Sequence, residues 1–147
     1  MINYSDITTA LAEQILADQS IQNTLRKNFV ERGGPINENA SDAPWIGVYR
    51  GAITHDPRIL GGVNNWESTG LIRICVQSIS MVSGSACEDS LEELVRLVIA
   101  AILADTTIGG TVDMVNKFAV DYRYLESNRK SLYFQMAIIS MTFEVKS

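Results

Sequence analysis

The chain has 147 residues, 46% hydrophobic and 20% charged, a composition that fits one globular domain and excludes a disordered chain. Its formal net charge of -5 repels phosphate, so it is not expected to wrap duplex nucleic acid. The strongest apolar run, residues 97–104, is far too short to span a bilayer.

Two amphipathic helices are expected at the start of the chain. Ser5 or Asp6 can cap the first helix. Its apolar stripe, at four-residue spacing, consists of Ile7, Leu11 and Ile15. The second helix is expected to start at Ser20 and to end at the Gly-Gly-Pro sequence of residues 33–35.

A short strand between two loops is predicted next. Residues 31–43 are polar and rich in turn-forming types, which predicts a loop. Residues 45–50 are aromatic and β-branched, which predicts a strand. Residues 51–69 contain glycine and asparagine pairs and an Asp-Pro step, so we expect a long loop there.

The clearest local signals lie in the middle of the chain. Residues 71–81 form a strand in which one face carries Ile72, Ile74 and Val76 and the other carries Arg73, Cys75 and Gln77. Ser85 and Glu88 have the spacing of a capping box at the start of a helix. That helix, expected over 86–104, is apolar nearly all round toward its end and should be the central buried helix.

Two strands and a turn close the chain. Residues 118–124 alternate, and residues 132–145 are apolar on both faces near their start, so that strand should be covered on both sides. Residues 127–130 form the turn between them. The element order predicts one α+β domain over 1–147, with a mainly antiparallel four-stranded sheet and helices packed on one face.

The sequence offers little catalytic or metal-binding chemistry. His55 beside Asp56 could orient a base, but nothing in the sequence places a nucleophile next to it. One histidine and the separated Cys75 and Cys87 do not supply a zinc site. The N-terminus lacks a signal-peptide pattern, so we expect a cytoplasmic chain with reduced thiols. We expect no enzyme activity, no metal and no cofactor.

The long 51–69 segment is expected to be an assembly surface, because it carries basic and aromatic residues in an acidic protein. The basic turn at 127–130 is a second candidate. The candidate interface residues are Arg50, His55, Arg58, Trp66, Arg129 and Lys130. We expect the segment to be flexible when free and to order on assembly. An inert solvated loop, with Trp66 packed on its own domain, is the alternative.

The chain resembles the bacteriophage tail terminator, or tail completion, family in the order and length of its segments and in their pattern of apolar and polar residues. The resemblance covers the C-terminal two thirds, which read LIRICVQSISM, LEELVRLVIAAILAD, TTIGGTVDMV, FAVDYRYLE, SNRKS and LYFQMAIISMTFEVKS in succession. The N-terminal helix before a glycine-rich break also fits this order.

The resemblance implies a structural virion protein of the tail, assembled in the host cytoplasm without a membrane. Six copies would form a ring on the last ring of the tail tube, stop its polymerisation and offer a surface to the head-tail connector or stopper protein. DNA would pass through the lumen without sequence-specific binding, as an acidic protein allows. A contractile tail would add the sheath protein as a partner, and no catalytic residues carry over.

Three alternatives to a terminator stay open. A head-tail stopper, a connector or a baseplate structural protein would share the size and the acidity. A small hydrolase or thiol enzyme would use His55 or Cys87. A cytoplasmic ligand-binding domain is the third.

Overall fold

The computed structural model describes residues 3–27, 30–34, 42–60, 63–125 and 132–146, and the side chains of 56–60, 63–66 and 125 are outside that description. Its helices are α1 (Tyr4–Leu16), α2 (Gln19–Thr24) and α3 (Gly84–Leu103). Its strands are β1 (Glu31–Arg32), β2 (Trp45–Leu60), β3 (Val63–Ser80), β4 (Met114–Leu125) and β5 (Tyr133–Lys146). The chain is therefore of mixed α+β class, as the sequence predicts.

The strands form one sheet in the order β1-β2-β3-β5-β4. It is mainly antiparallel, as expected, but it has five strands and not four, because β1 pairs in parallel with β2. β1 lies inside the expected 31–43 loop and pairs Glu31 with Gly47 and Arg32 with Val48. A strand of two residues is too short to show an alternation that sequence analysis could detect.

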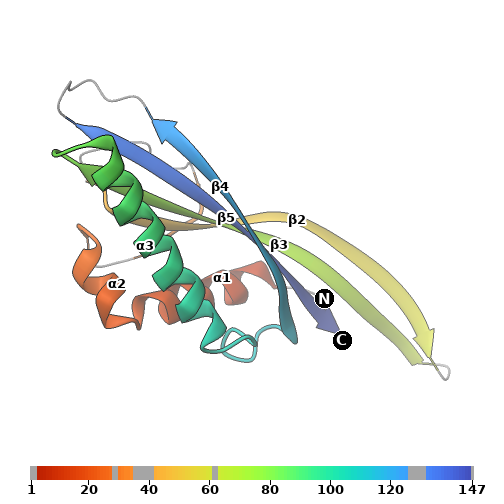
Figure 1. Ribbon diagram of the computed structural model, residues 1–147. Coiled ribbons are helices and arrows are strands. Elements are labelled where there is room, and N and C mark those ends of the chain that lie inside the picture. The colour runs from red at the N-terminus through yellow and green to blue at the C-terminus, as the bar shows by residue number, and fades with distance from the viewer. Residues whose placement is uncertain (1–2, 28–29, 35–41, 61–62, 126–131, 147) are drawn as a thin grey trace.

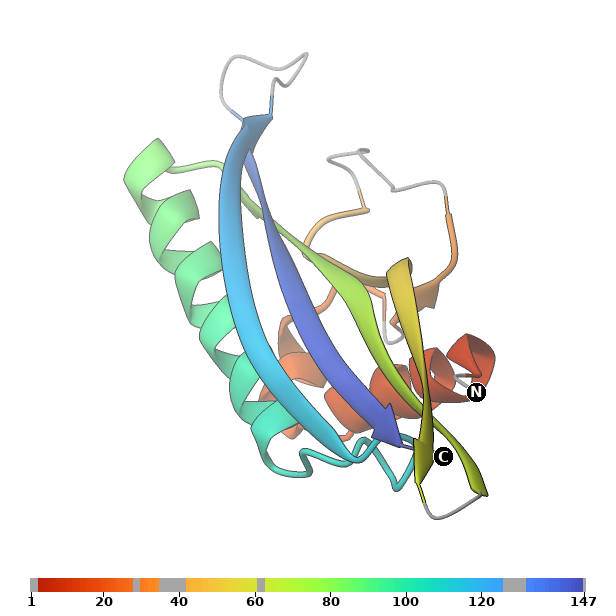
Figure 2. The same cartoon turned by 90° about the vertical axis from the view of Figure 1, so that its right-hand side faces the viewer.

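All three helices cover the same face of the sheet (Figures 1 and 2). The core between the layers includes the stripe Ile7, Leu11 and Ile15 of α1 and the predicted face Ile72, Ile74 and Val76 of β3. α3 packs on β3 and β5 and also contacts α1 and α2, so it is the central helix that its sequence predicts.

The helices begin at other caps than expected. Asn3, not Ser5 or Asp6, caps α1 by accepting from the Asp6 N–H at 3.3 Å. Ser83 caps α3 by accepting from the Ala86 N–H at 3.0 Å. The predicted capping box of Ser85 and Glu88 is therefore wrong. Ser85 already lies within the first helical turn, and Ser83 has the extended backbone that a cap needs.

The second helix is shorter than expected. Asp18 caps α2, which begins at Gln19 and ends at Thr24, well before the Gly-Gly-Pro sequence of 33–35. The backbone of Leu25 is extended, and the Arg26 N–H donates to the carbonyl of Pro44, so the chain leaves the helical path there.

The predicted 51–69 loop is wrong. β2 continues to Leu60 and β3 begins at Val63, and the two strands pair antiparallel up to the pair Leu60–Val63. A β-bulge between Arg50 and Ile53 interrupts the register where the expected strand would have ended. The sequence of this segment has glycine and asparagine pairs and no regular apolar alternation, so it does not predict these strands.

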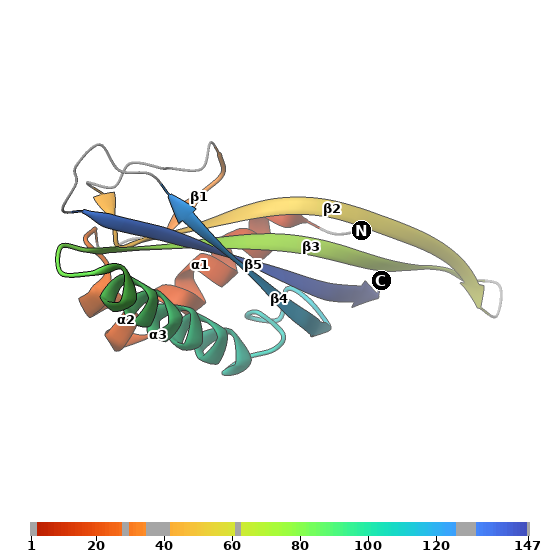
Figure 3. The ribbon, with the colours of Figure 1, turned by 45° about the horizontal axis from the view of Figure 1, so that its top comes forward.

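The outer part of this hairpin is a two-stranded ribbon. The last described pair between β3 and β5 is Glu67–Lys146, so among the described residues 57–60 and 63–66 pair only with each other. We call these eight residues the ribbon. It projects beyond the helices and beyond the other strands (Figures 1 and 3).

The face of the sheet away from the helices carries a smaller apolar cluster of Trp45, Cys75, Met136 and Ile138. The Trp45 Nε1–H donates to a Glu31 carboxylate oxygen at 2.9 Å and thereby ties β2 to β1. Both faces of β5 are buried from Phe134 to Ile139, which confirms the prediction for the start of this strand.

Candidate functional site

Tyr4, the first residue of α1, holds the base of the hairpin on the body. Its hydroxyl donates to the Ala52 carbonyl at 3.0 Å and accepts from the Leu71 N–H at 3.3 Å, so it bridges β2 and β3 beside the bulge. Burial raises the pKa of Tyr4, while the Leu71 hydrogen bond and the charge of Arg50 lower it. Tyr4 thus links the helix layer to the base of the hairpin.

The structure brings four predicted interface residues onto this hairpin. Arg50 and His55 are exposed on β2. Arg58 pairs with Asn65 and Trp66 with Pro57 along the ribbon, and the side chains of Arg58 and Trp66 lie outside the described part. The other two candidates, Arg129 and Lys130, lie outside the described residues altogether.

The environment of His55 is that of a cross-strand contact. His55 is paired with Ser68 in the register, and its Nδ1 lies 2.7 Å from the Ser68 hydroxyl. Ser68 is 1% exposed, so its oxygen is shielded from any substrate. The pair therefore links β2 to β3 near the base of the ribbon.

A cleft of about 240 Å³ opens at the β1–β2 edge of the sheet. It is lined by Tyr4, Ser5, Thr8, Arg32, Gly33, Val48 and Arg50, and we call it the arginine cleft. The Arg32 guanidinium donates to the Ser5 carbonyl at 2.9 Å, which holds it against α1. Within the described residues, no carboxylate pairs with Arg32 or Arg50. Arg32 was not among the predicted residues.

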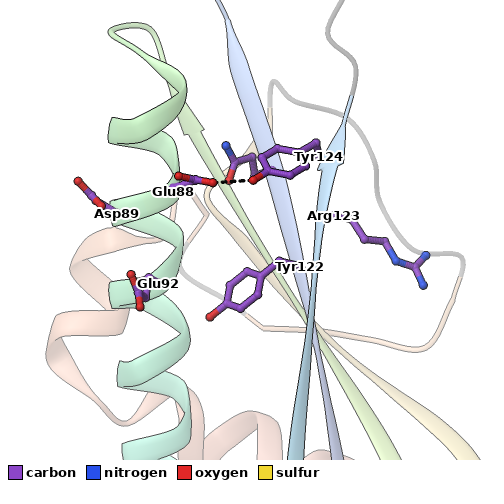
Figure 4. A pocket seen from close by; sticks show the side chains of 7 residues that line it. Glu88, Asp89, Glu92, Tyr122, Arg123 and Tyr124 are labelled. Atoms are coloured by element: carbon purple, nitrogen blue, oxygen red, sulfur yellow. Dashed lines mark hydrogen bonds between the residues drawn. The ribbon is translucent and has the colours of Figure 1, made fainter.

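A second cleft, of about 330 Å³, opens between α3 and β4. It is lined by Glu88, Asp89, Glu92, Tyr122, Arg123, Tyr124 and Gln135, and we call it the carboxylate cleft (Figure 4). The Tyr124 hydroxyl donates to Glu88 at 2.6 Å, and this contact raises the pKa of Tyr124. Arg123 points to the other side of β4 and pairs with Asp121 at 3.2 Å.

The sequence does not predict this second cleft. The acids from 88 to 93 are adequately explained as residues of an early helical turn, where the helix dipole favours anions. The alternation of Tyr122 and Tyr124 predicts only a shared face of a strand. Their meeting depends on how α3 lies along β4, which no local pattern encodes.

Both cysteines are buried and free. Burial raises the pKa of Cys75 to about 11 and also raises that of Cys87, which donates to the Ser78 and Tyr133 carbonyls. Within the described part of the chain, no three His, Cys, Asp or Glu residues are grouped as a metal site would need. Among the same residues, no helix has the length and apolarity required to cross a membrane.

No family model matches the sequence, and no curated protein matches it. Among solved structures, the chain is similar to a chain of the virion of native gene transfer agent (GTA) particle. That match covers 93% of each chain, with a TM-score of 0.39 and 8% sequence identity. A likeness at this level leaves the function to be argued from the surfaces of this chain.

Proposed function

We propose that this chain is a structural subunit of a phage-like virion, and more specifically a tail terminator that acts by assembly and not by catalysis. Six copies would form a ring on the last ring of the tail tube and stop its growth. The opposite side of the ring would meet the head-tail connector, and DNA would pass through the lumen. The observation that carries the proposal is the ribbon that projects from the sheet.

Among the residues that the structure describes, no third strand pairs with the ribbon. A two-stranded hairpin is at best marginally stable in water unless other strands or a helix cover it. Residues 57–60 and 63–66 extend past the last β5 partner of β3, and Tyr4 contacts only the base of the hairpin. A neighbouring subunit or the tail tube is therefore the surface that would stabilise the ribbon.

Pro57 and Arg58 in β2 also fit a ribbon that binds one specific partner and avoids unspecific strand pairing. β1 pairs with β2 only at Gly47 and Val48, so the outer side of β2 is an open edge over most of its length in the described chain. Proline and charged residues on open edges oppose unspecific strand pairing. An edge protected in this way can remain exposed before assembly.

The order of the elements supports the same proposal. Leaving aside the two-residue β1, helices, two strands, the central helix and two strands follow one another as the resemblance to tail terminators implies. β2 and β3 are longer than the sequence predicts, and their additional residues add the ribbon to this order of elements.

The experiment is a tube-length assay with electron microscopy of the purified protein. We expect six-fold rings, and tail tubes of normal length in the presence of wild-type protein. The variant Arg58→Ala/Trp66→Ala should fold but let the tubes overgrow, because the ribbon then loses its large contact side chains. Arg96→Ala/Tyr133→Ala, with both changes in the body, is the matched control and should cap normally. Normal tube length with the ribbon variant would refute the proposed role.

A further inference from the structure

The arginine cleft and the carboxylate cleft lie at opposite edges of one sheet. α1, β1 and β2 form the first, and α3 and β4 form the second. The strand order places β1 and β2 at one edge and β4 at the other, as Figure 2 shows. A surface at each edge is the arrangement that a head-to-tail contact between copies requires.

Both clefts also open on the helix side of the sheet. Arg50 lies two residues from Val48, whose side chain is in the core under the helices, so the two share a face of β2. Tyr122 and Tyr124 point toward α3, with Glu88 and Glu92 facing them from the helix (Figure 4). Two copies set side by side with their helix layers aligned would bring unlike clefts together.

The charges of the two clefts are opposite. Arg32 and Arg50 are exposed cations, and within the described residues neither has an ion-pair partner. Across the other cleft, Glu88, Asp89 and Glu92 are exposed carboxylates that likewise form no ion pair among the described residues. Such complementarity orients partners and rejects the like-charged pairing.

The carboxylate cleft also offers an aromatic wall. Tyr124 is 74% exposed and Tyr122 50% exposed, although both are large side chains with an apolar ring. The hydrogen bond to Glu88 holds the Tyr124 ring across the cleft before any partner arrives. Guanidinium groups stack favourably on aromatic rings, and Tyr and Arg are enriched at the energetic centres of interfaces.

We propose that these clefts are the two halves of one contact between copies of this chain. Arg32 and Arg50 of one copy face Glu88, Glu92 and Tyr124 of the next. The proposal rests on the ring of the proposed function and names the surfaces that close it. Because each copy uses two different surfaces, the contact is heterologous and generates a closed ring when the rotation between copies closes.

The test is a charge exchange between exposed residues of the full-length chain. Glu92→Lys reverses the charge of one residue in the carboxylate cleft, and Arg50→Glu reverses the charge of one residue in the arginine cleft. Each variant alone should self-associate at least about ten-fold more weakly than wild type, because the introduced lysine then faces the arginines of the next copy, or the introduced glutamate faces its carboxylates. An equimolar mixture should regain the wild-type assembly, since each altered cleft then meets an altered partner. In the mixture the two variants must alternate around the ring, which requires an even number of subunits, and a six-membered ring has an even number.

Native mass spectrometry and sedimentation velocity give the assembly state, and thermal melts confirm that each variant is folded. Glu93→Lys is the matched control: it makes the same charge change on α3, but at a residue paired with Arg96 and not lining the cleft. We expect this control to assemble like wild type, and added salt to weaken the wild-type contact.

The outcomes separate this contact from the proposed function. Wild-type assembly by both single variants, or a mixture that stays as dissociated as its components, would overturn the contact and leave the terminator role standing. A wild-type chain that remains monomeric would also overturn the contact, and the tube-length assay would still decide the terminator role.

Discussion

Gly70 of β3 lies directly against the ring of Phe143 of β5, and a Cβ atom on Gly70 would come within 2.4 Å of the Phe143 Cζ atom. The two residues are paired in the register, and Phe143 is fully buried. The same ring packs edge-on against Tyr4, with centroids 6.0 Å apart. Phe143 therefore supports the tyrosine that holds the base of the hairpin, and only glycine leaves room for its ring.

We predict that Gly70→Ala destabilises the domain by about 1–3 kcal/mol, the usual cost of overpacking a close-packed core. Gly34→Ala is the control, because a Cβ there meets no atom within 4 Å. Urea unfolding followed by circular dichroism measures both. Equal midpoints for Gly70→Ala and wild type would show that Phe143 can move aside.

The buried face of α3 gives the second prediction. Val98 is 0% exposed, so Val98→Asp should prevent stable folding, since an unpaired buried charge costs several kcal/mol. Ala100→Asp makes the same charge on the exposed side of the helix and should stay folded. Solubility and thermal melts distinguish the two, and a cooperative wild-type melt of Val98→Asp would contradict the packing.

The N-terminal cap of α3 gives the third prediction. Ser83→Ala should lower the free energy of unfolding by about 1 kcal/mol, because the Ala86 N–H loses its acceptor. Ser85→Ala should cost much less, since alanine suits a helical position. Denaturant titrations of both variants decide between these two serines as the cap.

A pH prediction follows from Cys75. Its pKa of about 11 lies above the ordinary value of 9.0, so the folded chain binds this proton more tightly than the unfolded chain. The corresponding stability is present below pH 9 and is lost as the pH rises toward 11. We expect Cys75→Ala to show a smaller loss of stability over that range. Identical pH dependence of the two chains would mean that Cys75 is not shielded in the folded state.

The ribbon gives the fifth prediction. In the free chain, the amides of 58–60 and 63–66 should exchange with deuterium much faster than those of 72–76, because among the described residues no third strand pairs with them. In rings, or on tail tubes, they should become protected. Hydrogen exchange with mass spectrometry reads both segments in one experiment, and unchanged exchange after assembly would argue against the ribbon as a contact.

Where an element carries a regular apolar stripe on one side, its sequence alone predicted the element. Burial imposes an apolar period, which is why the stripe of α1, the alternation of Ile72, Ile74 and Val76, and the central helix were all correctly predicted. The α+β class and the helices on one face follow from the same patterns. Because these signals are local, they need no knowledge of distant partners.

The tertiary structure alone decided the features on which the proposals depend. The ribbon is defined by its backbone pairing, whereas its sequence carries no regular apolar period and offers Gly61-Gly62 as a hairpin signal. Tyr124 meets Glu88 across 36 positions of sequence, and Arg32 meets Ser5 across 27. Contacts between residues so far apart depend on how the layers pack. Their chemistry was present in the sequence, but their pairing came only from the fold.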